Sequence, residues 1–189
     1  MSAGILYLHG FASSPASAKS SLLAATLQAR GQGERFFCPA LSPVPREAIA
    51  QAQTIIAAHA GPLTLIGSSL GGYYATWLAE THDLRAVLIN PAVVAPVSLN
   101  QYIGIQTNLH SGETFDFTAE HIAQLRALEV AKPNPERYLL LVETGDEVLD
   151  YRNAVARYAG CRQRVLEGGD HSFTRFADLL PELIEFCGL

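Results

Sequence analysis

Short, largely apolar runs are the feature that most limits what this chain can fold into. They occupy residues 5–9, 63–67, 84–90 and 138–144, and they show no sustained alternation of apolar and polar positions. A strand of this kind is buried on both faces, as in parallel sheets covered by helices. Longer stretches with helical periodicity separate the runs, as the crossovers between parallel strands require. The pattern predicts a three-layer α/β fold with a mostly parallel sheet of about six strands.

One long segment, residues 92–135, interrupts this regular order. The remaining expected elements are short strands over residues 36–39 and 164–167 and helices over residues 16–29, 46–60, 71–81, 118–130, 150–159 and 173–186. A connection as long as 92–135 is too large for a plain turn, and loops of that size are often functional. Ligands of such sheets bind beyond the carboxyl ends of the strands. We therefore expect a single domain over residues 1–189, with a short cap insertion over residues 92–135.

The composition predicts a folded chain with a large apolar interior. Hydrophobic residues make up 49% of the 189 residues, which excludes a disordered chain. Charged residues make up 16%, below the ~25% of typical soluble domains, so part of the surface is expected to be apolar, as a groove or a subunit contact. The oligomeric state stays open between monomer and dimer. The net charge of −5 argues against nucleic acid as a partner, because phosphate binding needs clustered Lys and Arg.

The sequence favours a cytoplasmic protein. The uncharged stretch over residues 87–111 contains asparagines and prolines that argue against a membrane span. The first residues lack the basic and apolar regions of a secretory signal. Cys38, Cys161 and Cys187 are an odd number at wide spacings, which is typical of free thiols rather than of disulfides or a zinc site.

The motif Gly-Ser-Ser-Leu-Gly at residues 67–71 follows one apolar run and precedes an expected helix. In this strand–turn–helix context, Gly-x-Ser-x-Gly predicts a nucleophile elbow. A sharp turn gives its middle residue, Ser69, a strained backbone with positive φ and lifts its hydroxyl out of the fold. Gly67 and Gly71 keep both flanks small enough for this turn. Ser68 is the rival nucleophile, but its position predicts a side chain that points into the structure.

A serine hydroxyl needs a base to act as a nucleophile, and the base needs an acid to orient it. His171 is the candidate base because its loop follows the last expected strand, at the same sheet edge as Ser69. Asp146 is the candidate acid, since it comes directly after the strand before that one. Asp150 is expected to cap the next helix, and Asp170 is the immediate neighbour of His171. The weaker candidates for the base are His9, His59, His82, His110 and His121.

The loop after the first strand is a candidate oxyanion hole. It reads His-Gly-Phe-Ala-Ser-Ser over residues 9–14, and Gly10 permits a close backbone approach. The backbone amides of Phe11 and Leu70 are expected to point together toward the site. For comparison, a single side-chain donor in an oxyanion hole typically contributes about 2.7–4 kcal/mol to transition-state binding. We expect His9 to brace this loop rather than to act as the base.

Five stretches of the sequence can be compared with known families: ILYLHGFASSP at 5–15, LIGSSLGGYYAT at 65–76, LINPAV at 88–93, TGDEVLDY at 144–151 and GGDHSF at 168–173. Taken together and in this order, they resemble the α/β-hydrolase superfamily and, more narrowly, the YqiA-type esterase family of bacteria. The resemblance runs from residue 4 almost to the end. It implies an α/β-hydrolase fold with a minimal sheet and a short-chain carboxylesterase, and it leaves acyl thioesters open as a second substrate class.

The resulting hypothesis is a serine hydrolase that cleaves small acyl esters through an acyl-enzyme, without a metal or organic cofactor. Tyr102 and Phe115 are candidate substrate-binding residues, although packing of the cap onto the sheet explains them equally well. The alternatives are an acyl-CoA thioesterase or transacylase with the same three residues, or a non-catalytic binding module. A CoA site would favour Lys or Arg near its mouth, for which Arg126 and Lys132 are the loose candidates.

Overall fold

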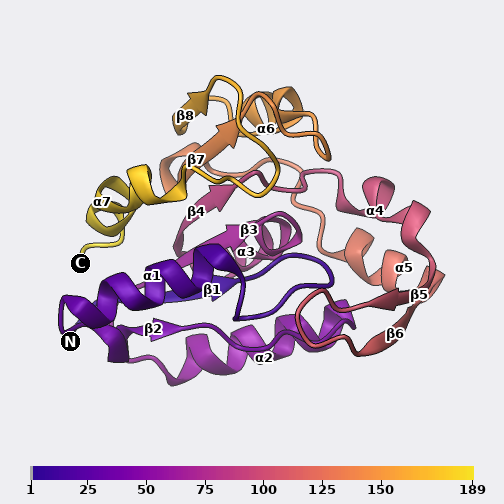
Figure 1. The fold of residues 1–189 in the computed structure, drawn as a ribbon, viewed down its shortest axis with the longest axis horizontal. Helices are drawn as coiled ribbons and strands as arrows, with labels where there is room; N and C mark the ends of the chain where they lie inside the picture. The colour runs from indigo at the N-terminus through magenta and orange to yellow at the C-terminus, as the bar shows by residue number, and fades with distance from the viewer. Residues whose placement is uncertain (1) are drawn as a thin grey trace.

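The apolar runs form the inner strands of a six-stranded sheet. In the computed structural model, which describes residues 2–189, the strand order is β2-β1-β3-β4-β7-β8 and every neighbouring pair is parallel (Figure 1). The strands are β1 (Gly4–Leu8), β2 (Phe36–Phe37), β3 (Leu63–Ser68), β4 (Arg85–Ile89), β7 (Tyr138–Glu143) and β8 (Arg162–Leu166). Every residue of β1, β3 and β7 is buried, whereas the edge strands β2 and β8 are partly exposed.

Helices cover both faces of the sheet, which confirms the predicted three layers. One layer contains α2 (Pro45–Ala58), α3 (Leu70–His82) and α6 (Tyr151–Arg157), and the other contains α1 (Ala18–Ala29) and α7 (Phe176–Phe186). Successive strand residues point to opposite faces. Leu6 and Leu8 therefore pack in the first layer, and Ile5 and Tyr7 in the second.

The 92–135 segment lies beyond the carboxyl ends of the strands, on the right of Figure 1, while both termini lie on the opposite side. It contains α4 (Ala95–Ser98), a 3₁₀ turn η2 (Asn100–Tyr102), the strands β5 (Gly104–Thr107) and β6 (Thr114–Phe117), and α5 (Ala119–Ala127). The segment ends at the first residue of the 3₁₀ turn η3 (Pro135–Arg137), and a further such turn, η1 (Gly33–Arg35), precedes β2.

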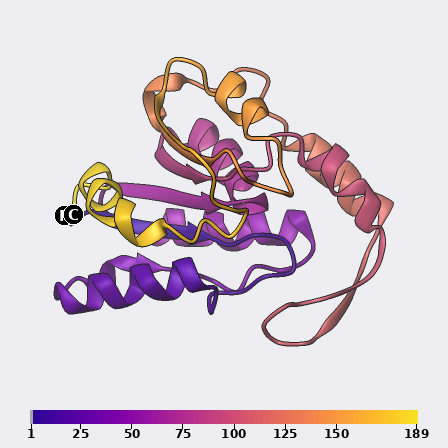
Figure 2. The same ribbon diagram turned by 45° about the horizontal axis from the view of Figure 1, so that its top comes forward.

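An antiparallel hairpin of β5 and β6 is the main feature that the sequence did not predict. Figure 2 shows it extending away from the parallel sheet. The expected helix over 118–130 is shorter, because α5 ends at Ala127, and the helix expected from residue 173 begins at Phe176. Among residues 2–189, no helix is long and apolar enough to cross a membrane.

Candidate active site

Ser69 occupies the sharp turn between β3 and α3. Its φ of 55° and ψ of −120° lie in a region that non-glycine residues rarely adopt, at a cost of roughly 1–3 kcal/mol. Its amide donates to the Ile89 carbonyl at 3.0 Å, and its own carbonyl accepts from Gly72 at 2.9 Å and from Ala92 at 3.0 Å. Ser68 is buried, as expected, whereas Ser69 is partly exposed. The surrounding hydrogen bonds therefore hold the strained turn in place.

The glycines on either side of the turn allow α3 to approach the sheet. A Cβ at Gly67 would lie 2.6 Å from the Gly72 Cα, and a Cβ at Gly71 would overlap the Leu8 carbonyl. Real Cβ atoms essentially never come so close to backbone. Any side chain at these positions would push α3, and the Ser69 hydroxyl with it, away from the strand ends.

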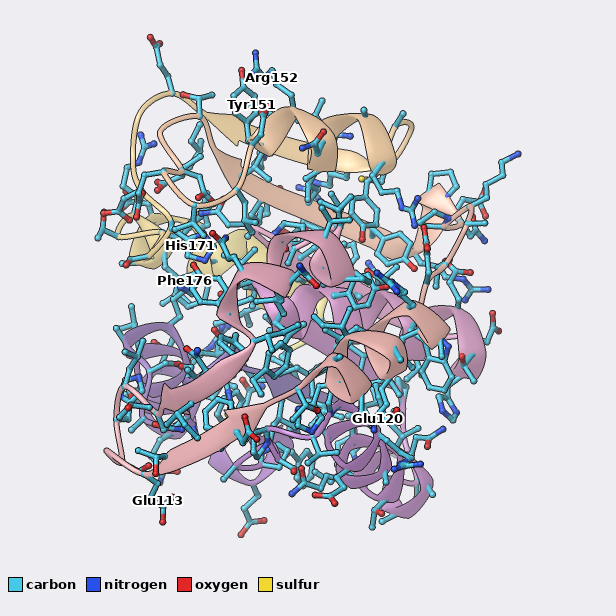
Figure 3. All side chains as sticks on the ribbon, turned by 90° about the vertical axis from the view of Figure 1, so that its right-hand side faces the viewer. Glu113, Glu120, Tyr151, Arg152, His171 and Phe176 are labelled. Atoms are coloured by element: carbon cyan, nitrogen blue, oxygen red, sulfur yellow. The ribbon has the colours of Figure 1, made fainter. Side chains whose placement is uncertain are left out.

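The side chains of Ser69, His171 and Asp146 meet at the carboxyl edge of the sheet. The His171 Nε2 lies 3.1 Å from the Ser69 Oγ, and the His171 Nδ1 lies 2.8 Å from the Asp146 Oδ2. With a proton on Nδ1, the imidazole donates to Asp146 and accepts from the serine hydroxyl. Figure 3 looks onto this edge and labels His171, with the hairpin that carries Glu113 below it.

Asp146 is rigidly held and almost completely buried. Its side chain is 2% exposed, and its Oδ1 accepts from the amides of Val148 at 2.9 Å and Leu149 at 2.8 Å. Asp150 caps α6 by accepting from the Arg152 amide, as predicted. Among the carboxylates of residues 2–189, Asp146 is therefore the one that contacts the His171 imidazole.

Asn90 joins the ends of β4 and β7 to the His171 loop, a role that the sequence did not predict. It has a φ of 39°, and its side-chain Nδ2 donates to the backbone carbonyls of Asp170 at 3.1 Å and His171 at 3.3 Å. Its Oδ1 accepts from the Glu143 amide at 3.0 Å. One buried side chain therefore fixes the loop backbone relative to two strands.

Glu143 is a second support that sequence reasoning missed. Its side chain is 0% exposed at the end of β7, and it accepts from the Asp170 amide and from the Arg175 Nε, both at 2.8 Å. Gly169, at a φ of +75°, packs so closely on this carboxylate that a Cβ would overlap it. The signal in the sequence that could have indicated this role is a glutamate at the last position of an otherwise apolar strand.

Glu147 holds the backbone of His171 itself. Its carboxylate accepts from the His171 amide at 2.9 Å, and this hydrogen bond lowers the pKa of Glu147. Because a carboxylate with a low pKa stays ionised near neutral pH, the bond is present where the site is expected to work.

The loop after β1 approaches the serine. A Cβ at Gly10 would lie 3.3 Å from the Ser69 Cβ, and neither the Phe11 amide nor the Leu70 amide donates to another group of residues 2–189. His9 braces the loop, since its Nε2 accepts from the Leu41 amide and its Nδ1 donates to the Gly10 carbonyl, both at 3.0 Å. Burial lowers the pKa of His9, which favours the neutral ring that these bonds require.

Two cavities flank the Phe11 side chain. Ser69 and His171 line one of about 560 Å³ together with Tyr102. Phe115 lies instead in a neighbouring cavity of about 630 Å³, which Leu70 also lines. The Phe11 ring contacts those of Tyr102 and Phe115, each at 5.7 Å between centroids, and that of Phe117 at 4.9 Å. This aromatic cluster ties the 92–135 segment to the loop after β1.

Tyr73 also connects α3 to the 92–135 segment. Its hydroxyl donates to the Leu125 carbonyl of α5 at 2.9 Å. Within residues 2–189, the three cysteines are unpaired, and no group of three or more His, Cys, Asp or Glu side chains is placed to hold a metal ion.

A model of the family described as "Uncharacterised protein family (UPF0227)" matches residues 4–188. The chain belongs to this family. The match confirms the resemblance to YqiA-type proteins that the five sequence stretches indicated.

Solved structures share the fold at low sequence identity. Alpha/beta hydrolase domain-containing protein 10 from mouse is 18% identical, with a TM-score of 0.71 over 100% of this chain and 92% of that chain. Est1E from Butyrivibrio proteoclasticus is 13% identical, with a TM-score of 0.72 over 98% of this chain and 88% of that chain. One of the metagenome-derived lipolytic enzymes LipS and LipT is 18% identical, with a TM-score of 0.61 over 98% of this chain and 93% of that chain. These likenesses establish the α/β-hydrolase fold.

Proposed function

We propose that this protein is a serine hydrolase that cleaves short-chain carboxylic esters through an acyl-enzyme formed on Ser69. The observation that carries the proposal is the unbroken hydrogen-bonded series from the Ser69 hydroxyl through the His171 imidazole to the Asp146 carboxylate. Residues from three separate loops form this series, on a serine whose backbone is strained. A binding module has no need of that strain or of that series.

In the proposed reaction, His171 removes the hydroxyl proton as the Ser69 Oγ attacks the ester carbonyl. Asp146 keeps the Nδ1 proton on the imidazole and stabilises the imidazolium that forms. His171 then protonates the departing alcohol. Water, activated by the same imidazole, attacks the acyl-enzyme and releases the acid. Every proton transfer uses His171, so the reaction needs neither a metal nor an organic cofactor.

The amides of Phe11 and Leu70 are the proposed oxyanion hole. Their lack of partners in the described chain supports this role, because both residues line cavities beside the site and their N–H groups are free to donate to a bound oxyanion. The Phe11 ring sits in the aromatic cluster, so its amide is held by side chains of the 92–135 segment. We infer that this segment acts as a cap that helps to keep the oxyanion hole in shape within a single-domain enzyme.

The size and lining of the cavity support a small acyl ester as substrate. A volume of about 560 Å³ suits a small molecule, and Tyr102 offers an apolar surface beside Ser69. Phe115 is proposed as a support of Phe11 more than as a direct substrate contact, since it lines the neighbouring cavity. Est1E has been solved with bound ferulic acid, and LipS and LipT are described as lipolytic.

Unpaired cysteines favour a reducing compartment such as the cytoplasm.

Hydrolysis of p-nitrophenyl esters tests the proposal. The purified protein should hydrolyse the acetate and butyrate esters, and Ser69→Ala should lower kcat by roughly 10⁴–10⁶. Ser68→Ala is the matched control, because it removes the neighbouring hydroxyl and should retain most of the turnover. Circular dichroism should show that both variants are folded. Near-normal turnover by folded Ser69→Ala protein would refute the proposal.

A further inference from the structure

The cavity that contains Ser69 has an unusual charge for this protein. The chain carries a net charge of −5, yet no Asp or Glu is among the described residues that line the cavity. Lys19 is the lining residue whose side chain is normally cationic, and the other polar lining residues are neutral or are histidines. The Arg126 and Lys132 side chains, which were the cationic candidates from the sequence, do not line it.

Lys19 is held with its ammonium group beside the His171 loop. It lies in the first turn of α1, and its Nζ donates to the Ser172 carbonyl at 2.7 Å, across 153 positions of sequence. Ser172 is the residue directly after His171. The contact therefore places a positive charge close to the group that is proposed to act as the base.

This ammonium group has hydrogen-bonding capacity to spare. An ammonium has three N–H donors, and one of them reaches Ser172. Among residues 2–189 no carboxylate lies within ion-pair distance of Lys19. Burial lowers the pKa of Lys19, while the charges of Asp170, Glu143 and Asp146 act in the opposite direction and favour the ammonium form. A half-buried cation without an ion-pair partner attracts an anion that enters the same cavity.

The α1 N-terminus adds to this positive potential. Ser17 and Ala18 line the same wall as Lys19, and the first-turn amides of a helix carry a partial positive charge. Leu99, Tyr102, Leu109 and Val148 contribute apolar surface elsewhere in the cavity, among neutral polar residues and histidines. The cavity thus combines apolar and neutral polar surface with one cationic wall.

We propose that Lys19 is a specificity-determining residue that selects esters bearing an anionic group, a carboxylate or a phosphate, on the part of the substrate that faces α1. This inference rests on the proposed ester hydrolysis at Ser69 and names the substrate class of that site. The free N–H groups of Lys19 bind the anion, and its bond to Ser172 fixes the ammonium in position. A lysine that only tethers α1 to the loop would affect all substrates equally.

Matched pairs of esters test the proposal. 4-Acetoxybenzoate and 4-acetoxyphenyl phosphate, each compared with neutral 4-acetoxybenzamide, place a carboxylate or a phosphate on the alcohol side. Mono-4-nitrophenyl suberate compared with 4-nitrophenyl octanoate places a carboxylate on the acyl side. We expect kcat/KM to favour the anionic member of at least one pair by about tenfold or more, because a hydrogen bond to a charged group is worth more than a neutral one. The preference should shrink as the salt concentration rises.

Variants of Lys19 separate specificity from tethering. Lys19→Met retains the length of the side chain and should reduce the anionic-to-neutral ratio of kcat/KM to about one, whereas Lys19→Arg should retain a preference. Lys132→Met is the control, because this exposed lysine does not line the cavity and its loss should leave the ratio unchanged.

Two results would overturn the proposal. One is the absence of any anionic preference in the unmodified protein, which needs no variant to measure. The other is an equal loss of kcat/KM for charged and neutral esters in Lys19→Met, which would make Lys19 a tether. The turnover of neutral esters by Ser69→Ala tests the proposed hydrolysis separately. A failure of the proposed function can therefore be distinguished from either of these two results.

Discussion

Removal of the Arg175 side chain should cost far more stability than its surface position suggests. Arg175 is 39% exposed, but its partner Glu143 is 0% exposed. Arg175→Met leaves the Glu143 carboxylate with the Asp170 amide as its remaining donor among residues 2–189. Loss of one partner of a buried ion pair typically costs about 3–5 kcal/mol. Because water can enter where the arginine was, we expect a value near the lower end, about 3 kcal/mol.

Urea denaturation, followed by circular dichroism, measures this free energy of unfolding. Arg152→Met is the matched control, since Arg152 pairs with Asp150 where the two side chains are 76% and 41% exposed, and exposed pairs contribute about 0–1 kcal/mol. The double variant Glu143→Gln with Arg175→Met should be more stable than Arg175→Met alone by at least about 1 kcal/mol, because no buried charge remains. Equal costs for Arg175→Met and Arg152→Met would refute the reasoning.

Two further predictions concern the turn at Ser69 and the loop at His9. Gly71→Ala should destabilise the protein by about 3 kcal/mol or more and abolish ester turnover, because its Cβ would overlap the Leu8 carbonyl. Thermal melts measure the loss of stability, and p-nitrophenyl ester assays measure the loss of turnover. A melting temperature and a turnover close to those of the unmodified protein would contradict this prediction. Burial lowers the pKa of His9 below its usual 6.5, so the unfolded chain binds a proton more readily there and stability should fall as pH drops below 6.5, by at most about 1.4 kcal/mol per pH unit for this one proton. His9→Gln should remove that part of the slope in urea denaturation between pH 5 and 7.5, and identical slopes would count against it.

The sequence predicted the parts of the fold that depend on local pattern. Continuous apolar runs identified the buried strands, because a strand covered on both faces has no reason to carry polar residues. The order of those strands along the chain then placed Ser69, Asp146 and His171 at one edge, since the carboxyl ends of parallel strands share an edge. These expectations needed no knowledge of side-chain contacts.

The features that the sequence did not predict depend on contacts between distant residues. The β5–β6 hairpin has four-residue strands that are half exposed, so its apolar pattern is weak. The packing of Phe11 among the rings of the 92–135 segment cannot be read from local spacing. Asn90 and Glu143 support the His171 loop through bonds that span more than 25 positions of sequence. Lys19 reaches the site from a helix that the motifs did not implicate.

Covalent labelling by a fluorophosphonate tests most directly whether the Ser69 hydroxyl is activated by its neighbours. Mass spectrometry of digested protein should find the phosphonyl group on Ser69, with one equivalent bound per chain, and His171→Gln should slow the labelling by at least about 100-fold, in line with the usual contribution of a general base. An adduct on Ser68 or elsewhere, or labelling that proceeds equally fast without the imidazole, would contradict the account.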